Sequence, residues 1–314
     1  MKKRIIIAFG GNALLKNGQK GSIDEQRENI KQSLNSVFPL IQQGHNIIIT
    51  HGNGPQVGNI LLKNDAGEIM YNIPQVPLDV AVANTQSEIG YMIQSELYNI
   101  LKQHKIDREI ISTNTMVEVA PDDIAFKNPT KRVGKTYYDL SEVSRISLEK
   151  SWIFKEEIKN GKKGFRRVVP SPKPLDIANN QSIKLMADNG IIVIAVGGGG
   201  IPVSIQNDQI IPEEAVIDKD LASALLANQI QADQFIILTD VDYVYLDYGS
   251  KNQKALKSIS YEKAIELMKQ GKFGEGNMAP KIQAALNYIN KGGKEVLITD
   301  LNGLKTLKGT IITK

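Results

Sequence analysis

Short runs of apolar, mostly β-branched residues recur along the chain and constrain its fold more than any other feature. None of these runs shows the strict apolar–polar alternation expected of a strand with one face in water. Such runs are typical of strands that are buried on both faces, as in a parallel sheet. We therefore predict strands at residues 4–9, 46–50, 109–112, 191–196, 234–239, 295–299 and 310–313.

Segments with helical spacing of apolar residues lie between these runs. The first begins after Ser22, which is followed three residues later by Glu25, the pattern of a capping box. Strands that alternate with helices along the whole chain predict an α/β fold with helices on both faces of the sheet. Further helices are predicted near residues 85–103, 218–229, 260–269 and 280–290.

The stretch from Pro121 to about Pro174 breaks this alternation. It is polar, prolines recur in it, and it contains Trp152, the only tryptophan of the chain. We interpret it as an insertion that forms a small lobe of its own. The alternative is a long irregular excursion over the surface.

The composition excludes several classes of protein. The 314 residues include no cysteine, which rules out disulfides and cysteine-ligated zinc, and three scattered histidines are too few for a convincing metal cluster. The net charge of +4 is spread along the chain, unlike the clustered charge of nucleic-acid-binding proteins. The N-terminal apolar run is too short for a signal peptide or a membrane span. We expect a soluble cytoplasmic protein without nucleic-acid or membrane partners.

Three predicted strands run directly into glycine-rich turns, at residues 10–12, 52–54 and 197–200. Open α/β sheets bind ligands outside the carboxyl ends of their strands, so all three turns should share one rim. Glycine lets backbone N–H groups approach an anion without a Cβ in the way, which favours a phosphate site. The alternative is that each glycine only makes a tight turn. We interpret His51 as a loop residue without a chemical role and Gln56 as a hydrogen-bond donor.

The standard nucleotide-binding patterns are missing from these turns. Neither GxGxxG nor GxxxxGKS/T occurs in the chain. A Rossmann dehydrogenase and a P-loop enzyme are therefore poorly supported.

Three lysines stand in contexts that suit phosphoryl transfer, a reaction that needs cations around the moving group. Lys131 lies in the predicted lobe. Lys219 lies at a predicted helix start between Asp218 and Asp220, and Asp220 could hold the lysines by charge pairing. Lys281 follows a proline that we expect at the first position of a helix, near its positive end. The alternative is that Asp218 caps a helix and the remaining charges form ordinary surface pairs.

Two further stretches carry candidate polar residues. Thr239 and Asp240 end a predicted strand with Tyr243 nearby, which suits an adenine and ribose pocket, although an ordinary strand-to-turn junction would look the same. Arg166 and Arg167 could meet a phosphate or could equally be surface charge.

Eight collinear motifs resemble those of a known family. The motifs are AFGGNALL, THGNGPQVGN, FKNPTK, VVPSPKP, GGGGIPV, EAVIDKDLAS, ILTDVD and MAPKIQAA, and the match extends from residue 4 to about residue 313. Together they resemble the carbamate kinases of the amino acid kinase superfamily. The resemblance implies a three-layer αβα sandwich around a mainly parallel open sheet, with a protruding subdomain at about residues 121–174, and a homodimer.

The resemblance also implies an activity. Carbamate kinases transfer a phosphoryl group reversibly between carbamoyl phosphate and ADP, giving ATP and carbamate, with Mg²⁺ held mainly on the nucleotide phosphates. Residues 1–210 would hold carbamoyl phosphate or carbamate, and residues 211–314 would hold ADP or ATP. The usual setting is the fermentation of arginine or agmatine. Carbamate is already an anion, so no general base is needed and a scarcity of histidine is expected.

Motif positions carry the family's site residues over to this chain. The transferring group would be stabilised by three lysines, Lys131, Lys219 and Lys281, which Asp220 would orient. The phosphoryl site would be lined by Gly10, Gly11, Asn12, Gly52, Asn53 and Gly54. The nucleotide would be bordered by Thr239, Asp240, Tyr243 and Met278.

The chain departs from the family pattern at four notable positions, Asn84, Ser87, Arg132 and Asn277. These changes affect the contacts of the lobe and the entry to the carbamoyl site. Two alternatives therefore stay open: another kinase of the superfamily that acts on an amino-acid carboxylate, such as acetylglutamate, or a nucleotide-binding paralogue with weak or no catalysis.

Overall fold

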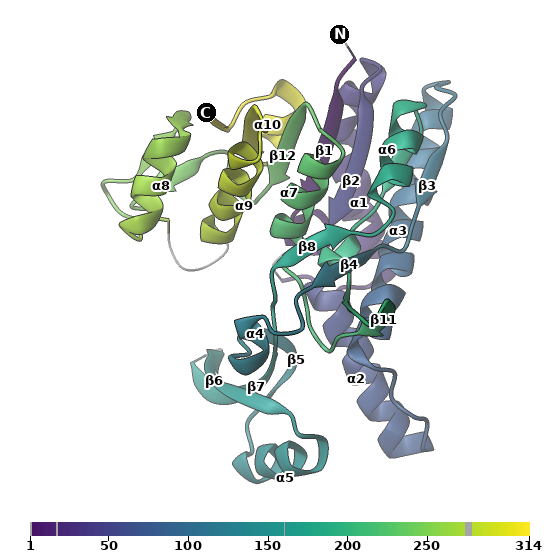
Figure 1. Ribbon diagram of the computed structural model, residues 1–314, viewed down its shortest axis with the longest axis vertical. Coiled ribbons are helices and arrows are strands. Elements are labelled where there is room, and N and C mark those ends of the chain that lie inside the picture. The colour runs from purple at the N-terminus through teal and green to yellow at the C-terminus, as the bar shows by residue number, and fades with distance from the viewer. Residues whose placement is uncertain (1, 17, 160, 274–277) are drawn as a thin grey trace.

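The computed structural model describes residues 2–16, 18–159, 161–273 and 278–314. A central sheet lies between two layers of helices, and a smaller lobe projects from one end of this body (Figure 1). The chain is thus the α/β sandwich with a mainly parallel sheet that the sequence predicts.

The main sheet has eight strands, in the order β15-β17-β16-β12-β1-β2-β9-β3. All neighbouring strands are parallel except β16 and β17. All seven predicted strands are present in it, with ends that shift by at most two residues. In sheet order the bounds are Ser258–Ser260, Thr310–Thr313, Glu295–Thr299, Gln234–Leu238, Arg4–Phe9, Asn46–His51, Ile192–Ile194 and Ile110–Ser112.

Both faces of the sheet are apolar, which explains why its strands lack alternation. In β1, Ile6 and Ala8 face one core while Ile5, Ile7 and Phe9 face the other. The first core contains residues of α6 (Asn180–Asp188), α7 (Lys219–Gln229), α8 (Tyr261–Lys269) and α9 (Met278–Asn290). The second contains residues of α1 (Ile23–Gln42), α3 (Leu78–Gln103) and α10 (Leu301–Thr306).

Local sequence signals fix where several helices begin. Ser22 and Glu25 form the predicted capping box at the start of α1. The side chain of Asp300 caps α10 in the same way that Asp218 caps α7, by accepting backbone N–H bonds. Helix α2 (Gly54–Tyr71) was not predicted, because it has two internal glycines and only a weak apolar face.

The stretch after Pro121 forms regular structure, so the alternative of an irregular excursion is wrong. Helix α4 (Ile124–Lys127) precedes a sheet of order β5-β7-β6, and α5 (Leu140–Lys150) packs on it. The strands span Lys131–Tyr137, Lys162–Val169 and Ile153–Lys159. Tyr137, Val143 and Ile146 give this lobe an apolar cluster of its own.

Two smaller sheets complete the fold. One has the order β11-β10-β4-β8, with bounds Gln209–Pro212, Ile201–Gln206, Met116–Val119 and Pro174–Ile177, and the other pairs β13 (Val244–Leu246) with β14 (Lys254–Leu256). Within the described ranges, no helix is both long and apolar enough to cross a membrane.

Candidate active site

The three glycine turns open on the same rim of the main sheet, as predicted. Strands β1, β2 and β9 are parallel neighbours, so their carboxyl ends lie side by side. A Cβ on Gly52 would lie 3.1 Å from Cδ of Lys219, so the stem of this lysine passes close over the turn. A Cβ on Gly10 would lie 2.7 Å from the carbonyl oxygen of Leu238. A side chain at Gly10 would therefore clash with the backbone, and one at Gly52 would press on the stem of Lys219.

The second turn leads into a helix that points its N-terminus at the rim. Gly54 is the first residue of α2, and the first N–H groups of a helix have no partner within it. A Cβ on Gly11 or Gly54 would meet nothing within 4 Å, so both face open space. Asn53 is buried, and its Nδ2 donates to Oγ1 of Thr85 at 2.8 Å. Of Asn12, which lies in η1 (Gly11–Ala13), only the backbone belongs to the described part.

The third turn, η2 (Gly197–Gly199), packs directly against the second. A Cβ on Gly197 would lie 2.5 Å from Nε2 of His51, and one on Gly198 would lie 2.2 Å from Nδ2 of Asn53. Gly198 also has φ of +66°, a left-handed conformation that side chains disfavour. The turns at residues 52–54 and 197–200 therefore form one packed unit.

We expect Gly198→Ala to destabilise the protein more than Gly271→Ala. Both glycines have φ of +66°, but a Cβ on Gly271 would meet nothing within 4 Å. Both variants carry the same backbone strain. The difference between their losses of unfolding free energy therefore reports the clash with Asn53, which we expect to be about 1–3 kcal/mol. Urea unfolding measures it, and equal losses of unfolding free energy in both variants would contradict the packing described above.

Two buried polar residues of α3 support these turns and were missed by the sequence analysis. Gln86 Nε2 donates to the carbonyl oxygens of Gly197 at 2.8 Å and Thr115 at 3.2 Å, and its Oε1 accepts from the Thr115 backbone N–H at 2.8 Å. Thr85 accepts from Asn53. The sequence signal that could have revealed them is that these two polar residues lie within the apolar stripe of a helix, where a buried polar side chain needs a hydrogen-bond partner.

His51 is the last residue of β2, so its interpretation as a loop residue is wrong. It is buried, and its Nδ1 lies 2.9 Å from the carbonyl oxygen of Gly52. Burial is the main cause that lowers the pKa of His51 to about 4, and the charge of Lys219 lowers it further. The imidazole is therefore neutral at neutral pH, with Nδ1 donating to Gly52.

His51 should make the protein less stable as the pH falls from about 6.5 to 4. The pKa of His51 in the folded protein lies below its ordinary value, so as the pH falls the unfolded chain takes up the proton first. The free energy of unfolding therefore decreases by about 3 kcal/mol across this window. In His51→Gln the unfolding free energy should depend less on pH over the same range. Replacing the exposed His104 with glutamine is the control, and parallel pH profiles of His51→Gln and wild type would refute the assignment.

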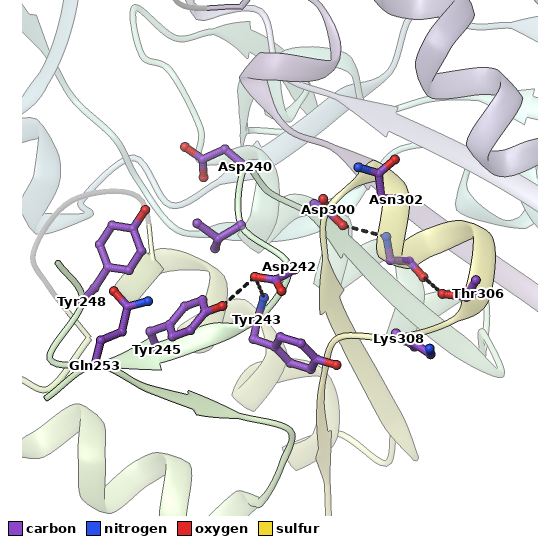
Figure 2. A pocket seen from close by; sticks show the side chains of 12 residues that line it. Asp240, Asp242, Tyr243, Tyr245, Tyr248, Gln253, Asp300, Asn302, Thr306 and Lys308 are labelled. Carbon is purple, nitrogen blue, oxygen red and sulfur yellow. Dashed lines mark hydrogen bonds between the residues drawn. The ribbon is translucent and has the colours of Figure 1, made fainter. Parts of the chain in front are cut away.

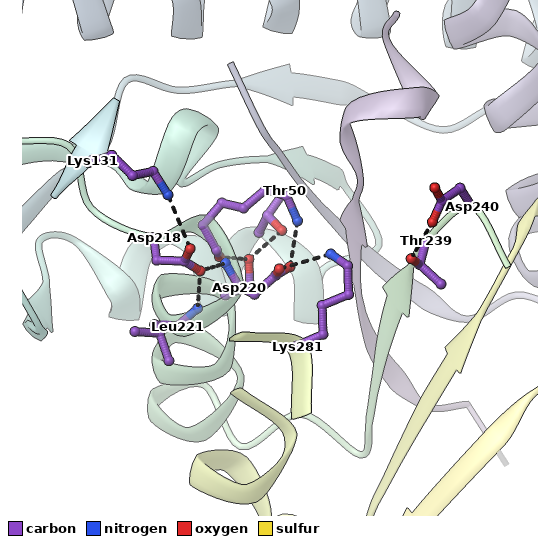
Figure 3. Close-up of polar contacts among 10 residues, drawn as sticks. Thr50, Lys131, Asp218, Asp220, Leu221, Thr239, Asp240 and Lys281 are labelled. Atoms are coloured by element: carbon purple, nitrogen blue, oxygen red, sulfur yellow. Dashed lines mark hydrogen bonds and ion pairs between the residues drawn. The ribbon is translucent and has the colours of Figure 1, made fainter. Parts of the chain in front are cut away.

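A buried carboxylate joins two of the three predicted lysines (Figure 3). Asp220 Oδ1 lies 2.5 Å from Nζ of Lys219, and Oδ2 lies 2.9 Å from Nζ of Lys281. Burial alone would raise the pKa of Asp220, but the two ammonium groups together lower it to about 2. Burial, and then the charge of Lys219, lowers the pKa of Lys281. The interpretation of these charges as ordinary surface pairs is wrong, because both Asp220 and Lys281 are buried.

The third lysine reaches the same place from the lobe. Nζ of Lys131, at the start of β5, lies 3.3 Å from Oδ2 of Asp218. Oδ1 of Asp218 accepts from the backbone N–H groups of Asp220 and Leu221, so it also caps α7 as the alternative proposed. The cap and the lysine cluster coexist. Figure 3 shows the ammonium groups of Lys131 and Lys281 near the start of α7, where Lys219 also pairs with Asp220.

The predicted position of Pro280 at the first residue of a helix is wrong. Helix α9 begins at Met278, so Lys281 is its fourth residue but still lies in the first turn. Proline is tolerated there because the first N–H groups of a helix lack partners in any case. Met278 packs against the core that includes α9, and Asn277 lies outside the described residues.

The end of β12 borders an open cavity of about 620 Å³ (Figure 2). Asp240 and Tyr243 line it, together with Tyr245, Asp300 and other residues of the β13–β14 hairpin and α10. Thr239 lies next to it and donates from Oγ1 to Asp240 Oδ1 at 3.1 Å. Of the four residues predicted to border the nucleotide, Asp240 and Tyr243 therefore line this cavity, whereas Thr239 and Met278 do not.

Arg167 does not lie on the surface, which settles one of the alternatives left open. Its side chain is 7% exposed, and its Nη2 lies 2.8 Å from Glu214 Oε2. Arg166 lies beside it on β7, where its Nη1 is 4.0 Å from Glu157 Oε2. Both arginines thus face carboxylates of the protein.

The departures from the family pattern that can be placed, Asn84, Ser87 and Arg132, have exposed side chains. Asn84 and Ser87 are exposed on α3, where Ser87 Oγ donates to Asn114 Oδ1 at 3.1 Å. Arg132 is exposed on the lobe, and its Nη2 donates to the carbonyl oxygen of Glu156 at 3.2 Å.

Comparison with known proteins agrees with this arrangement. The family model described as "Amino acid kinase family" matches residues 3–300. A carbamate kinase of Pyrococcus furiosus is 43% identical over 310 residues, and one of Pyrococcus horikoshii is 44% identical, each match covering 98% of both chains. This chain belongs to the carbamate kinases of the amino acid kinase family.

Solved structures agree with this membership. A carbamate kinase from Giardia lamblia bound to AMP-PNP has a TM-score of 0.93 and 36% identity, covering 100% of this chain and 99% of that one. An N-acetylglutamate synthase from Neisseria gonorrhoeae is 13% identical with a TM-score of 0.57, so it shares the fold alone with this carbamate kinase family member.

Proposed function

We propose that this protein catalyses reversible phosphoryl transfer between carbamoyl phosphate and ADP, which gives ATP and carbamate. The observation that carries the proposal is the pair of lysines held by buried Asp220 beside the glycine turns. Relatives named carbamate kinase, 40–44% identical over 97–99% of their own length, supply the substrate.

The proposed chemistry consists of positioning and charge neutralisation. A terminal phosphate oxygen of ADP attacks the phosphorus of carbamoyl phosphate, the bond from phosphorus to the carbamoyl oxygen breaks, and carbamate leaves as an anion. In the reverse direction carbamate attacks ATP without losing a proton, so neither direction requires a general base. The ammonium groups of Lys131, Lys219 and Lys281 neutralise charge on the moving phosphoryl group, which is the main demand of this reaction.

The remaining roles are carried over from the matching motif positions of the family. The turns at residues 10–12 and 52–54 line the phosphoryl site with backbone N–H groups and the first turn of α2. Thr239, Asp240, Tyr243 and Met278 border the nucleotide. The part spanning residues 1–210, with the protruding subdomain at about 121–174, holds carbamoyl phosphate, and residues 211–314 hold the nucleotide.

A Mg²⁺ ion would be held at this site mainly by the phosphates of the nucleotide. Asp220 is engaged by two lysines, and Asp218 is engaged by Lys131 and by the start of α7. Among the described residues, no group of three or more acidic or histidine side chains is arranged to hold a metal ion. The nucleotide phosphates would therefore supply most ligands, and the ion would neutralise their charge.

The test is ATP formation by the purified protein from carbamoyl phosphate and ADP, with and without Mg²⁺, read by luciferase. A parallel panel offers ATP with N-acetylglutamate and other amino-acid carboxylates. Magnesium-dependent ATP formation supports the proposal. Activity only on an amino-acid carboxylate would support a different kinase of the family, and ADP binding without turnover would support a paralogue that has lost catalysis.

Three further properties belong to the same proposal. We expect a homodimer, which analytical ultracentrifugation would report as twice the chain mass of 34.6 kDa. We expect the protein in the cytoplasm, which cell fractionation would test. Its metabolic setting would be the fermentation of arginine or agmatine, and deletion of the gene should then impair growth on those compounds.

A further inference from the structure

A buried arginine joins the lobe to the main body. Arg167 lies on β7 of the lobe, and its side chain is only 7% exposed. Its Nη2 lies 2.8 Å from Oε2 of Glu214, which follows β11 in the main body. Its guanidinium also lies 4.0 Å from the centre of the Trp152 ring. The guanidinium therefore lies between an aromatic ring of the lobe and a carboxylate of the body.

The strand that carries this arginine also positions Lys131. Strand β5 pairs with β7, and Lys131 lies opposite Val169, two residues beyond Arg167. The next residue, Pro170, accepts a backbone hydrogen bond from Val216 of the main body at 3.0 Å. Arg167 therefore lies close to the point where the lobe joins the body and to the lysine that reaches Asp218.

The other contacts between the lobe and the body differ in character. Val133 and Val169 of the lobe share an apolar cluster with residues of α2 and α3, including Val57 and Leu78. An ion pair joins Lys150 to Glu68 of α2 at 2.7 Å, but its side chains are 28% and 44% exposed. Exposed pairs of this kind contribute little to stability. In the Arg167–Glu214 pair the carboxylate is 58% exposed and only the arginine, at 7%, is a buried charge, so the arginine is the member that depends strongly on its partner.

We propose that Arg167 is a positioning residue for Lys131, acting through its ion pair with Glu214; this inference rests on the proposed function of Lys131. Nε of Arg167 has no hydrogen-bond partner among the described residues, and Glu214 is the main counter-charge of the buried guanidinium, with a smaller contribution from Asp65. Without that carboxylate, the guanidinium gains hydration only if the lobe moves away from the body. Such movement withdraws Lys131 from the site.

The first test separates KM from kcat. Carbamoyl phosphate would bind productively only to the closed arrangement, so a smaller closed fraction raises its KM in proportion. We expect Arg167→Ala to raise KM for carbamoyl phosphate by about tenfold, with kcat changed by less than about threefold. Glu214→Gln, which preserves the shape of the side chain, should raise the same KM by about threefold and leave the KM for ADP unchanged.

Two comparisons distinguish positioning from a general loss of structure. Glu68→Gln breaks the exposed ion pair between the same two bodies and should change KM by less than about twofold. In a Lys131→Ala background, Glu214→Gln should have no further effect on KM, because the pair acts through Lys131. An unchanged KM in Glu214→Gln alone, or an undiminished effect in the Lys131→Ala background, would overturn the proposal.

Trp152 provides a readout that does not depend on activity. It is the only tryptophan of the chain, and it lines a small cavity between the lobe and α2 together with Leu61 and Arg167. Glu214→Gln should increase the quenching of its fluorescence by acrylamide, and Glu68→Gln should not. Equal quenching in wild type and Glu214→Gln would refute the positioning role even if the enzyme acts on carbamoyl phosphate. Absence of ATP formation by the wild type, with increased quenching in the variant, would instead refute the proposed function.

Discussion

Lys281→Ala should lower ATP formation from carbamoyl phosphate and ADP by about a hundredfold or more, with the fold intact. The ammonium group is buried in the first turn of α9 and lies 2.9 Å from Asp220. A preorganised charge in such a site stabilises the transition state without reorganisation at the moment of transfer. Asp220 would keep Lys219 as its partner, so the buried carboxylate does not become unpaired.

The matched control is Lys263→Ala. Lys263 lies in the first turn of α8, but it is exposed and pairs with Glu266 on the surface at 2.7 Å. This variant should retain wild-type turnover, and circular dichroism should show that both proteins are folded. Near-normal turnover in Lys281→Ala would mean that the nucleotide end of the site has been misplaced.

Asp220→Asn should lower both stability and turnover. The carboxylate is 4% exposed and is the shared partner of Lys219 and Lys281. Removing its charge leaves two ammonium groups close together without their counter-ion, a loss of about 3–5 kcal/mol for a buried pair. Urea unfolding would measure the change in free energy, and the luciferase assay would measure turnover.

Glu262→Gln is the appropriate comparison for this variant. Glu262 is the second residue of α8, as Asp220 is of α7, but its carboxylate does not bridge lysines in a buried site. The unfolding free energy of Glu262→Gln should differ from that of the wild type by less than about 0.5 kcal/mol. If Asp220→Asn were as stable as Glu262→Gln, the carboxylate would not be what holds the lysines together.

Features that depend on neighbouring residues were predicted well from the sequence. The strands of the main sheet, the Ser22–Glu25 capping box and the common rim of the three glycine turns all follow from local pattern and the geometry of parallel sheets. The three lysines and their pairing with Asp220 were proposed from their contexts in the sequence, and the family resemblance then gave them a common site. No local rule could have placed residues 131, 219 and 281 together, because they are far apart in the chain.

Features that depend on packing between distant segments were missed. His51 becomes buried only when η2 packs on the end of β2, and Gln86 bonds to that turn across 111 residues of sequence. Arg167 is buried in a place where its guanidinium contacts Trp152 and Glu214, which are 15 and 47 residues away in the chain. None of these environments can be read from a short window of sequence.

The central position of β1 has a consequence for synthesis of the chain on the ribosome. This strand is synthesised long before one of its two partners, β12, which starts at Gln234. At about 5–20 residues per second, roughly 10 to 45 seconds pass before that partner is made. Throughout this interval we expect the edge of β1 that pairs with β12 to lack its partner, and an unpaired apolar strand edge of this kind favours aggregation unless something covers it.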